Sequence, residues 1–90
     1  MIKCAAIRFD EKLPDNSFKK RVVSGNSHGD ILYMISAMDI SRDTNTYEYG
    51  FLTDTRDFVD RKEAFQIASA AHQLKSGYEN NNTLESYMLK

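Results

Sequence analysis

The sequence has few of the residues that hold metal ions or close disulfide bonds. Its 90 residues include one cysteine, Cys4, and two histidines, so an intrachain disulfide and a structural zinc pattern are both excluded. Free cysteines are usually buried, and we expect Cys4 to be a small buried strand residue. A chain without disulfides is typical of the cytosol, so we expect a cytoplasmic protein.

Long hydrophobic runs and an excess of one charge are also missing. No stretch approaches the roughly 18 apolar residues that span a bilayer, and Lys3 and Arg8 interrupt any signal-peptide core, so we expect no membrane contact. Twelve basic residues against thirteen acidic ones give a net charge of −1. This balance argues against a protein that coats DNA or RNA, which needs a marked basic excess. The length allows one small domain, residues 1–90.

The pattern of apolar residues predicts an α+β fold. Residues 2–9 and 20–24 are typical of strands, and the polar segment 10–20, which holds the only proline, predicts a loop between them. Residues 40–46 are turn-like, and β-branched and aromatic residues predict a strand over 46–53. With two helices, the expected order is β-β-α-β-α plus a short C-terminal segment, around a small antiparallel sheet.

Both helices are predicted from their capping residues and from apolar spacing. Ser27 fits the N-cap of a helix over 28–39, and Asp60 fits the N-cap of a second helix that continues to Lys75. Gly77 is then the expected residue beyond the second C-terminus. Alanines recur along this second helix, which predicts close packing against the sheet or against a second copy of the chain.

Residue types used in catalysis are present, but each has a structural explanation. His28 falls in the first turn of a predicted helix, and His72 falls among helical alanines as a core or interface residue. Asp54, Asp57 and Asp60 recur every three residues, yet they lack the central glycine and closing glutamate of a calcium loop. We therefore expect no enzyme, no bound metal and no cofactor.

An anion site is chemically possible near the two predicted helix N-termini, which offer free amides and the positive end of the helix dipole. Arginine suits bidentate contact with phosphate, and an aromatic ring can stack on a base. Solvated charges over a phenylalanine core fit these residues equally well. The candidate side chains are Arg21, Phe51, Arg56, Phe58 and Arg61.

The segment over 50–64, GFLTDTRDFVDRKEA, resembles a motif of a group of small phage proteins. In that group a strand ending in Gly-Phe-Leu-Thr runs into Arg-Phe-Val-Asp-Arg-x-Glu-Ala and then a helix. The beginning is similar too, with a strand over 2–9, a second strand closing on Ser24-Gly25, and His28 opening a helix. The group includes the first-described anti-Thoeris proteins. These proteins sequester cyclic ADP-ribose-type immune signals without degrading them, some relatives bind cyclic oligonucleotides, and they assemble as dimers or hexamers.

The resemblance implies roles for individual residues. Arg61 matches the second arginine of the motif and is the residue it implies for phosphate contact. Phe51 and Thr53 match the end of the strand, and His28 matches the histidine that opens the first helix.

Two positions depart from the group's pattern. Asp57 stands where the first arginine is usual, with Arg56 displaced by one residue, and Ser27 stands where a basic residue usually precedes the histidine. An aspartate facing phosphate repels it.

The leading hypothesis is a phage protein that binds and sequesters a cyclic nucleotide or cyclic ADP-ribose-type defence signal, acting as a homo-oligomer in the bacterial cytoplasm. The alternative is a small phage interaction protein that binds and inhibits a host or defence protein, using its acidic loop and the strand with Tyr47 and Tyr49. A hydrolase of the same signal needs a base or metal that the sequence does not place.

Overall fold

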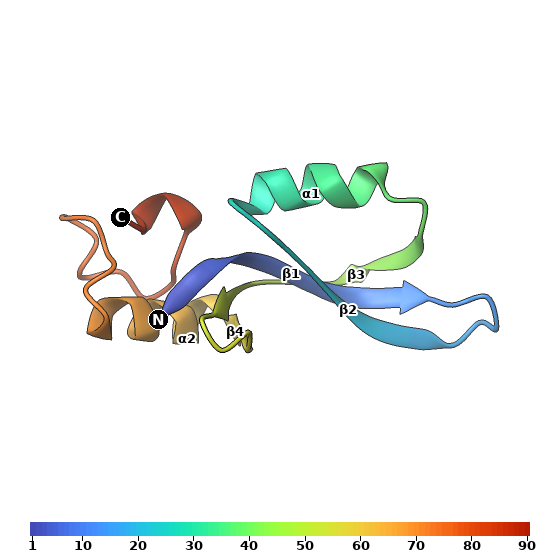
Figure 1. Ribbon diagram of the computed structural model, residues 1–90, viewed down its shortest axis with the longest axis horizontal. Coiled ribbons are helices and arrows are strands. Elements are labelled where there is room, and N and C mark those ends of the chain that lie inside the picture. Colours follow the sequence, from blue (N-terminus) through green and yellow to red (C-terminus); the bar gives the residue numbers. More distant parts are fainter.

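The structure is a computed structural model that describes residues 1–90, with principal extents of 47 × 21 × 20 Å. A four-stranded antiparallel sheet in the order β2-β1-β3-β4 carries both helices, which confirms the predicted α+β class and adds β4, which the sequence pattern did not indicate (Figure 1). The elements are β1 (Ile2–Lys12), β2 (Phe18–Gly25), α1 (His28–Ala37), β3 (Ser41–Thr53), β4 (Phe58–Asp60), α2 (Arg61–Ala70) and a 3₁₀ turn (Ser86–Met88).

The β1–β2 hairpin is longer than predicted. Most of the expected loop over 10–20 is strand, because β1 runs to Lys12 and β2 begins at Phe18. The true turn is short: the Leu13 N–H donates to the Ser17 carbonyl at 2.8 Å, and Asn16 takes the left-handed conformation with φ 67°. Polar residues continue as strand here because oppositely charged side chains face one another across the two strands.

The expected turn over 40–46 is also strand, because β3 begins at Ser41. Its polar residues lie at an irregularity of the sheet. Here the register of β1 against β3 changes from Arg8 to Asp10. The Thr46 hydroxyl accepts from the Asp10 N–H at 2.8 Å and donates to the Asp43 carbonyl at 2.6 Å. The side chains that suggest a turn therefore stabilise a bulge within a long strand.

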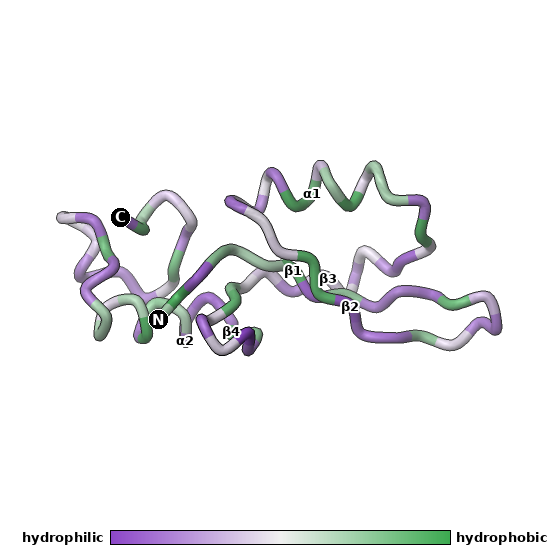
Figure 2. The backbone as a smooth tube through the Cα atoms, viewed as in Figure 1, coloured by the Kyte–Doolittle hydropathy of each residue, from purple (hydrophilic) through white to green (hydrophobic).

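Helix α1 begins as predicted and ends two residues early, at Ala37. The Ser27 hydroxyl accepts from the Asp30 N–H at 3.2 Å, which confirms the N-cap. Ile31 and Ile35 are buried against the sheet, while hydrophobic residues also occupy other faces of the helix (Figure 2). A helix that is apolar on its solvent side as well is unusual for an isolated surface helix.

Helix α2 begins at its predicted cap, where the Asp60 carboxylate accepts from the Glu63 N–H at 2.7 Å. It ends at Ala70 rather than at Lys75. His72 takes the left-handed place beyond the C-terminus, with φ 56°, and the Gln73 N–H donates to the Ala68 carbonyl at 2.8 Å in a Schellman-type closure. His72 is therefore not a helical core residue, and Gly77, with φ 98°, belongs to a later turn.

The core lies on one face of the sheet. Alternate β1 side chains from Ala5 through Phe9 are fully buried there, together with Phe51 of β3 and apolar residues of both helices. Alanines of α2 make the predicted close contact with this core, and Leu84 and Met88 dock the C-terminal segment onto it. Cys4 points to the other face and is half-buried rather than buried.

Candidate functional site

The turn between β3 and β4 is a closed hydrogen-bonded loop that presents Arg56. The Thr53 N–H donates to the Asp57 carbonyl at 3.0 Å, and the Arg56 N–H donates to the Thr53 carbonyl at 2.9 Å. Arg56 itself is in the left-handed conformation, with φ 67°. Its side chain is exposed and makes no ion pair or hydrogen bond, so its guanidinium is free for an anion.

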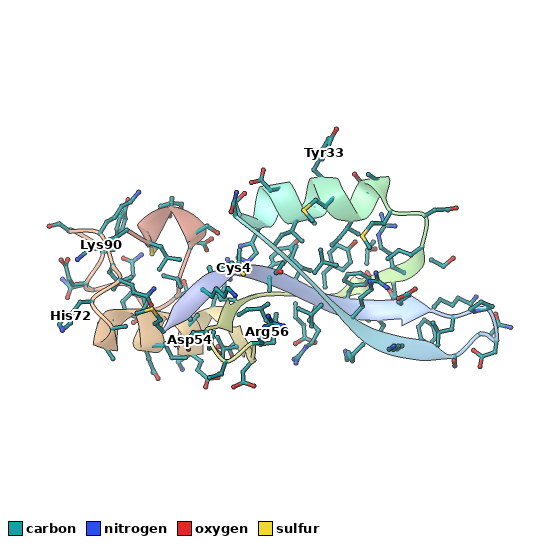
Figure 3. All side chains as sticks on the ribbon, viewed as in Figure 1. Cys4, Tyr33, Asp54, Arg56, His72 and Lys90 are labelled. Carbon is teal, nitrogen blue, oxygen red and sulfur yellow. The ribbon has the colours of Figure 1, made fainter.

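The aspartates beside Arg56 have partners of their own. The chain's amino-terminal nitrogen contacts the Asp54 carboxylate at 3.2 Å, and Asp54 and Arg56 lie near the same end of the sheet (Figure 3). The Thr55 hydroxyl donates to the Asp57 carboxylate at 2.9 Å, and the Asp57 N–H donates to the Thr53 hydroxyl at 3.2 Å. Asp57, which departs from the phage motif, is thus a turn-closing residue, and its charge is partly satisfied within the loop.

Phe58 lies across Gly50 and under an arginine. A Cβ at Gly50 would fall 2.6 Å from the Phe58 ring, so glycine at that position is what allows the ring to lie so close to β3. The Arg8 guanidinium carbon is 4.5 Å from the centre of the same ring, and an Arg8 nitrogen is 2.6 Å from the Glu48 carboxylate. The Arg8 guanidinium and the Phe58 ring form a cation–π pair on the face of the sheet opposite the core.

This same face carries an ion-pair network that the sequence pattern does not predict. The Lys20 amine is 3.0 Å from Asp10 and 3.6 Å from Glu48. The hydrogen bond to Asp10 raises the pKa of the Lys20 amine, and the hydrogen bond from Arg8 lowers the pKa of the Glu48 carboxyl. Strand alternation places Arg8 on this face, so the alternating pattern of β1 is the sequence signal that could have identified Arg8.

His28 and Phe51 are brought together, with His28 half-buried at the edge of the core and Phe51 inside it. The His28 Nε2 lies 2.8 Å from the Gly50 carbonyl, and since a carbonyl only accepts, Nε2 is the protonated nitrogen. The ring centres of His28 and Phe51 are 5.1 Å apart, and the Tyr49 ring stacks on the histidine at 5.5 Å. Phe51 is 0% exposed. These contacts join the start of α1 to β3, and the buried Phe51 presents no free aromatic face to a ligand.

The two other candidate arginines are paired with carboxylates. Arg61 contacts Glu85 at 2.6 Å, so it ties α2 to the C-terminal segment. Arg21 contacts Glu11 at 2.9 Å across the β1–β2 hairpin. Of the seven candidate residues, the structure groups Thr53, Arg56 and Phe58 around the β3–β4 turn and places the half-buried His28 against the buried Phe51. The remaining two, Arg21 and Arg61, are paired with carboxylates outside this turn.

The cavities of the chain lie elsewhere. One of about 450 Å³ lies between the β1–β2 turn and the segment that precedes β3, and one of about 350 Å³ lies beside His72 near the C-terminus. None of the candidate site residues lines either cavity. No three His, Cys, Asp or Glu side chains are grouped to hold a metal ion, and no helix is long and apolar enough to cross a membrane.

Comparison with known families places this geometry in a phage context. A model of the family described as phage T4 y16D protein matches residues 1–89. The chain belongs to this family. No curated protein and no solved structure matches the chain. The family assignment covers nearly the whole chain, so the fold described above, including the β3–β4 turn, is the fold of a y16D family member.

Proposed function

We propose that this phage protein binds and sequesters a cyclic nucleotide or cyclic ADP-ribose-type defence signal, without degrading it, in the cytoplasm of the infected bacterium. The proposal is supported by the phage family and by the resemblance of residues 50–64 to the anti-Thoeris motif. The observation that carries it is the free guanidinium of Arg56, held by a closed turn two residues before the Arg8–Phe58 pair.

Each part of this surface has a chemical role in the proposal. The free Arg56 side chain neutralises a phosphate, because guanidinium donors match phosphate oxygens in geometry. The Arg8 plane, fixed by Glu48 on one edge and by the Phe58 ring below, is a platform on which a base can stack. Withholding a signal requires binding alone, so the proposal assigns no acid, base or nucleophile.

The departure at Asp57 fits this arrangement. Its carboxylate is engaged by the Thr55 hydroxyl, so the displaced arginine at position 56, rather than residue 57, supplies the positive charge of the turn. Arg61, which the resemblance implies as the phosphate contact, is already paired with Glu85, so part of its charge is compensated within the chain. Replacing Arg56 and replacing Arg61 therefore have different expected effects on ligand affinity, which one titration can compare.

Isothermal titration with cyclic ADP-ribose isomers and with cyclic di- and trinucleotides tests the proposal. Loss of a charge-assisted hydrogen bond costs about 1.5–3 kcal/mol, so Arg56→Gln should weaken binding by roughly 10- to 100-fold. Arg21→Gln removes the same charge from the distant hairpin and should bind like the wild type. Loss of affinity in Arg61→Gln but not in Arg56→Gln would move the site to the start of α2, and no heat with any ligand would refute the proposal.

A second function is favoured by the outer side of α1. Leu32 and Tyr33 are 37% and 78% exposed, and Tyr33 points away from the sheet (Figure 3). Exposed aromatic and aliphatic residues on one helix are typical of protein contacts. This surface fits a protein that inhibits a host or defence protein better than the acidic loop does, because Asp57 and Asp60 are used in local hydrogen bonds. Stoichiometric capture of one host protein, lost in Tyr33→Ser, would support it.

A further inference from the structure

The sheet has one long edge without a partner. In the order β2-β1-β3-β4, the two outer strands are β4, with three residues, and β2, with eight. An edge strand presents a row of free N–H and C=O groups that can pair with another strand. The short β4 has few such free backbone groups, whereas β2 (Phe18–Gly25) presents them over the length of a full strand.

Exposed apolar side chains lie on both faces of this edge. Of the eight large hydrophobic residues that are exposed, Phe18 and Val22 belong to β2, with 57% and 41% of their surface free. Met34 of α1, 44% exposed, lies above the same strand, since its sulfur is 3.7 Å from the Cβ position of Gly25. The edge therefore offers apolar area as well as backbone groups.

The charges of β2 are already compensated within the chain. Lysine side chains on an edge usually prevent pairing with another copy. Here the Lys20 amine contacts Asp10 at 3.0 Å and Arg21 contacts Glu11 at 2.9 Å, so Lys19 is the one β2 cation without an acidic partner. An acidic strand of another protein would find little unpaired positive charge on this edge. A second copy of β2 would experience little charge repulsion there.

We propose that two copies of this chain pair through β2 in antiparallel fashion, with the two-fold axis at Val22. Residues that face each other across an antiparallel strand pair point to the same side of the sheet. The two-fold axis must therefore lie at one residue of β2, midway between two neighbours that share a face. An axis at Arg21 sets two arginines opposite each other. An axis at Val22 sets Val22 against itself, Lys20 against Ser24 and Arg21 against Val23, with no like charges directly opposed.

The pairing joins two four-stranded sheets into one of eight strands, with both cores on the same side. A stable dimer buries about 800 Å² per partner. The edge strands supply the hydrogen bonds, and Phe18, Val22 and Met34 supply apolar area beside them. The dimer does not rest on the ligand proposed above, because every group it uses belongs to the free β2 edge or to α1.

Light scattering after size-exclusion chromatography tests the stoichiometry without any ligand. The expected mass is twice the 10.3 kDa of the chain. Val22→Lys sets two lysines against each other at the axis and should return the mass to 10.3 kDa. Tyr87→Lys, which places the same charge at an exposed site in the C-terminal segment, should remain a dimer. Urea midpoints of both variants show that each is folded. A monomeric wild type, or a Val22→Lys variant that stays dimeric, overturns the proposal.

Disulfide formation tests the register. In a Cys4→Ala background, Val22→Cys brings two Cα atoms within the roughly 7 Å that a disulfide allows, and mild oxidation should give a covalent dimer. Phe18→Cys in the same background places its two sulfurs at opposite ends of the strand pair, about 27 Å apart, and should not crosslink. A crosslink through Phe18→Cys and none through Val22→Cys would contradict the Val22 axis.

Discussion

Replacing Gly50 by alanine is the change whose effect follows most directly from the structure. A Cβ at this position would fall 2.2 Å from the Val59 carbonyl oxygen and 2.6 Å from the Phe58 ring. The first contact is with backbone of the adjacent strand β4, which pairs with β3 at Gly50, and cannot be relieved by rotating a side chain. The methyl group must therefore push β4 away from β3 or force the Phe58 ring off the sheet.

Overpacking of this kind costs about 1–3 kcal/mol, and we expect Gly50→Ala near the upper end, at about 3 kcal/mol, because backbone must move. A domain of this length is stabilised by roughly 5–13 kcal/mol, so the loss is a large share of the total. Urea denaturation followed by circular dichroism measures it. Since about 1 kcal/mol shifts the melting temperature by roughly 4–8 °C, the variant should melt more than about 10 °C below the wild type.

Gly29→Ala is the matched control. Gly29 lies in the first turn of α1, and the nearest atom to its Cβ position is the Ser27 hydroxyl at 3.9 Å, an ordinary contact. Alanine is the better helix former, so this variant should gain up to about 1 kcal/mol. Equal urea midpoints for Gly50→Ala and the wild type would refute the reasoning, because the close approach of β4 to β3 would then be absent.

Three further predictions concern stability. Asp60→Ala removes the cap of α2 and should cost about 1 kcal/mol in urea denaturation, whereas Asp60→Asn should restore most of it. Gln73→Ala removes the two 2.8 Å hydrogen bonds to the Ile2 backbone and should cost about 2 kcal/mol, with faster amide exchange at the start of β1 if the contact is as described. The pKa of Glu48 is lowered in the folded state, so its stabilisation is present above its ordinary value of 4.5 and is lost as the pH falls through the lower folded value. Glu48→Gln should therefore be less stable than the wild type at neutral pH, with the difference vanishing in acid; a constant difference across pH would contradict this.

The sequence predicts the local parts of this fold well, because caps and apolar alternation act over a few residues. Ser27 and Asp60 cap the two helices as expected, and alternation along β1 identifies its buried face. The end of α2 is different. The helix stops at Ala70, and Gln73 then bonds both backbone groups of Ile2, a contact across 71 positions that no local pattern contains.

Strand pairing explains the other errors. Residues 41–46 have turn composition, yet they pair with the end of β1 and use Thr46 and Asp43 to form a bulge. The three-residue β4 exists because Gly50 lets Phe58 and Val59 approach β3. Such elements depend on neighbours far along the chain, so tertiary contacts override composition.

For the candidate site, the sequence shows which residues have suitable chemistry, but it does not show which of them form ion pairs within the chain. Their chemistry makes the arginines candidate anion ligands, but which of them is free depends on distant carboxylates: Glu11 pairs with Arg21 and Glu85 pairs with Arg61. Phe51 has the same side chain as Phe58 and is fully buried, because it faces the core side of β3. Only the three-dimensional arrangement separates Arg56 from the others.

The central claim is that the protein withholds a defence signal and leaves it intact. The most direct measurement is to incubate the purified protein with an extract that contains the signal, wash the complex, heat it to denature the protein, and analyse the supernatant by mass spectrometry. We expect unmodified cyclic nucleotide or cyclic ADP-ribose-type messenger to be released, and far less of it from the Arg56→Gln variant. Recovery of a cleaved messenger, or of none from folded protein, would contradict it.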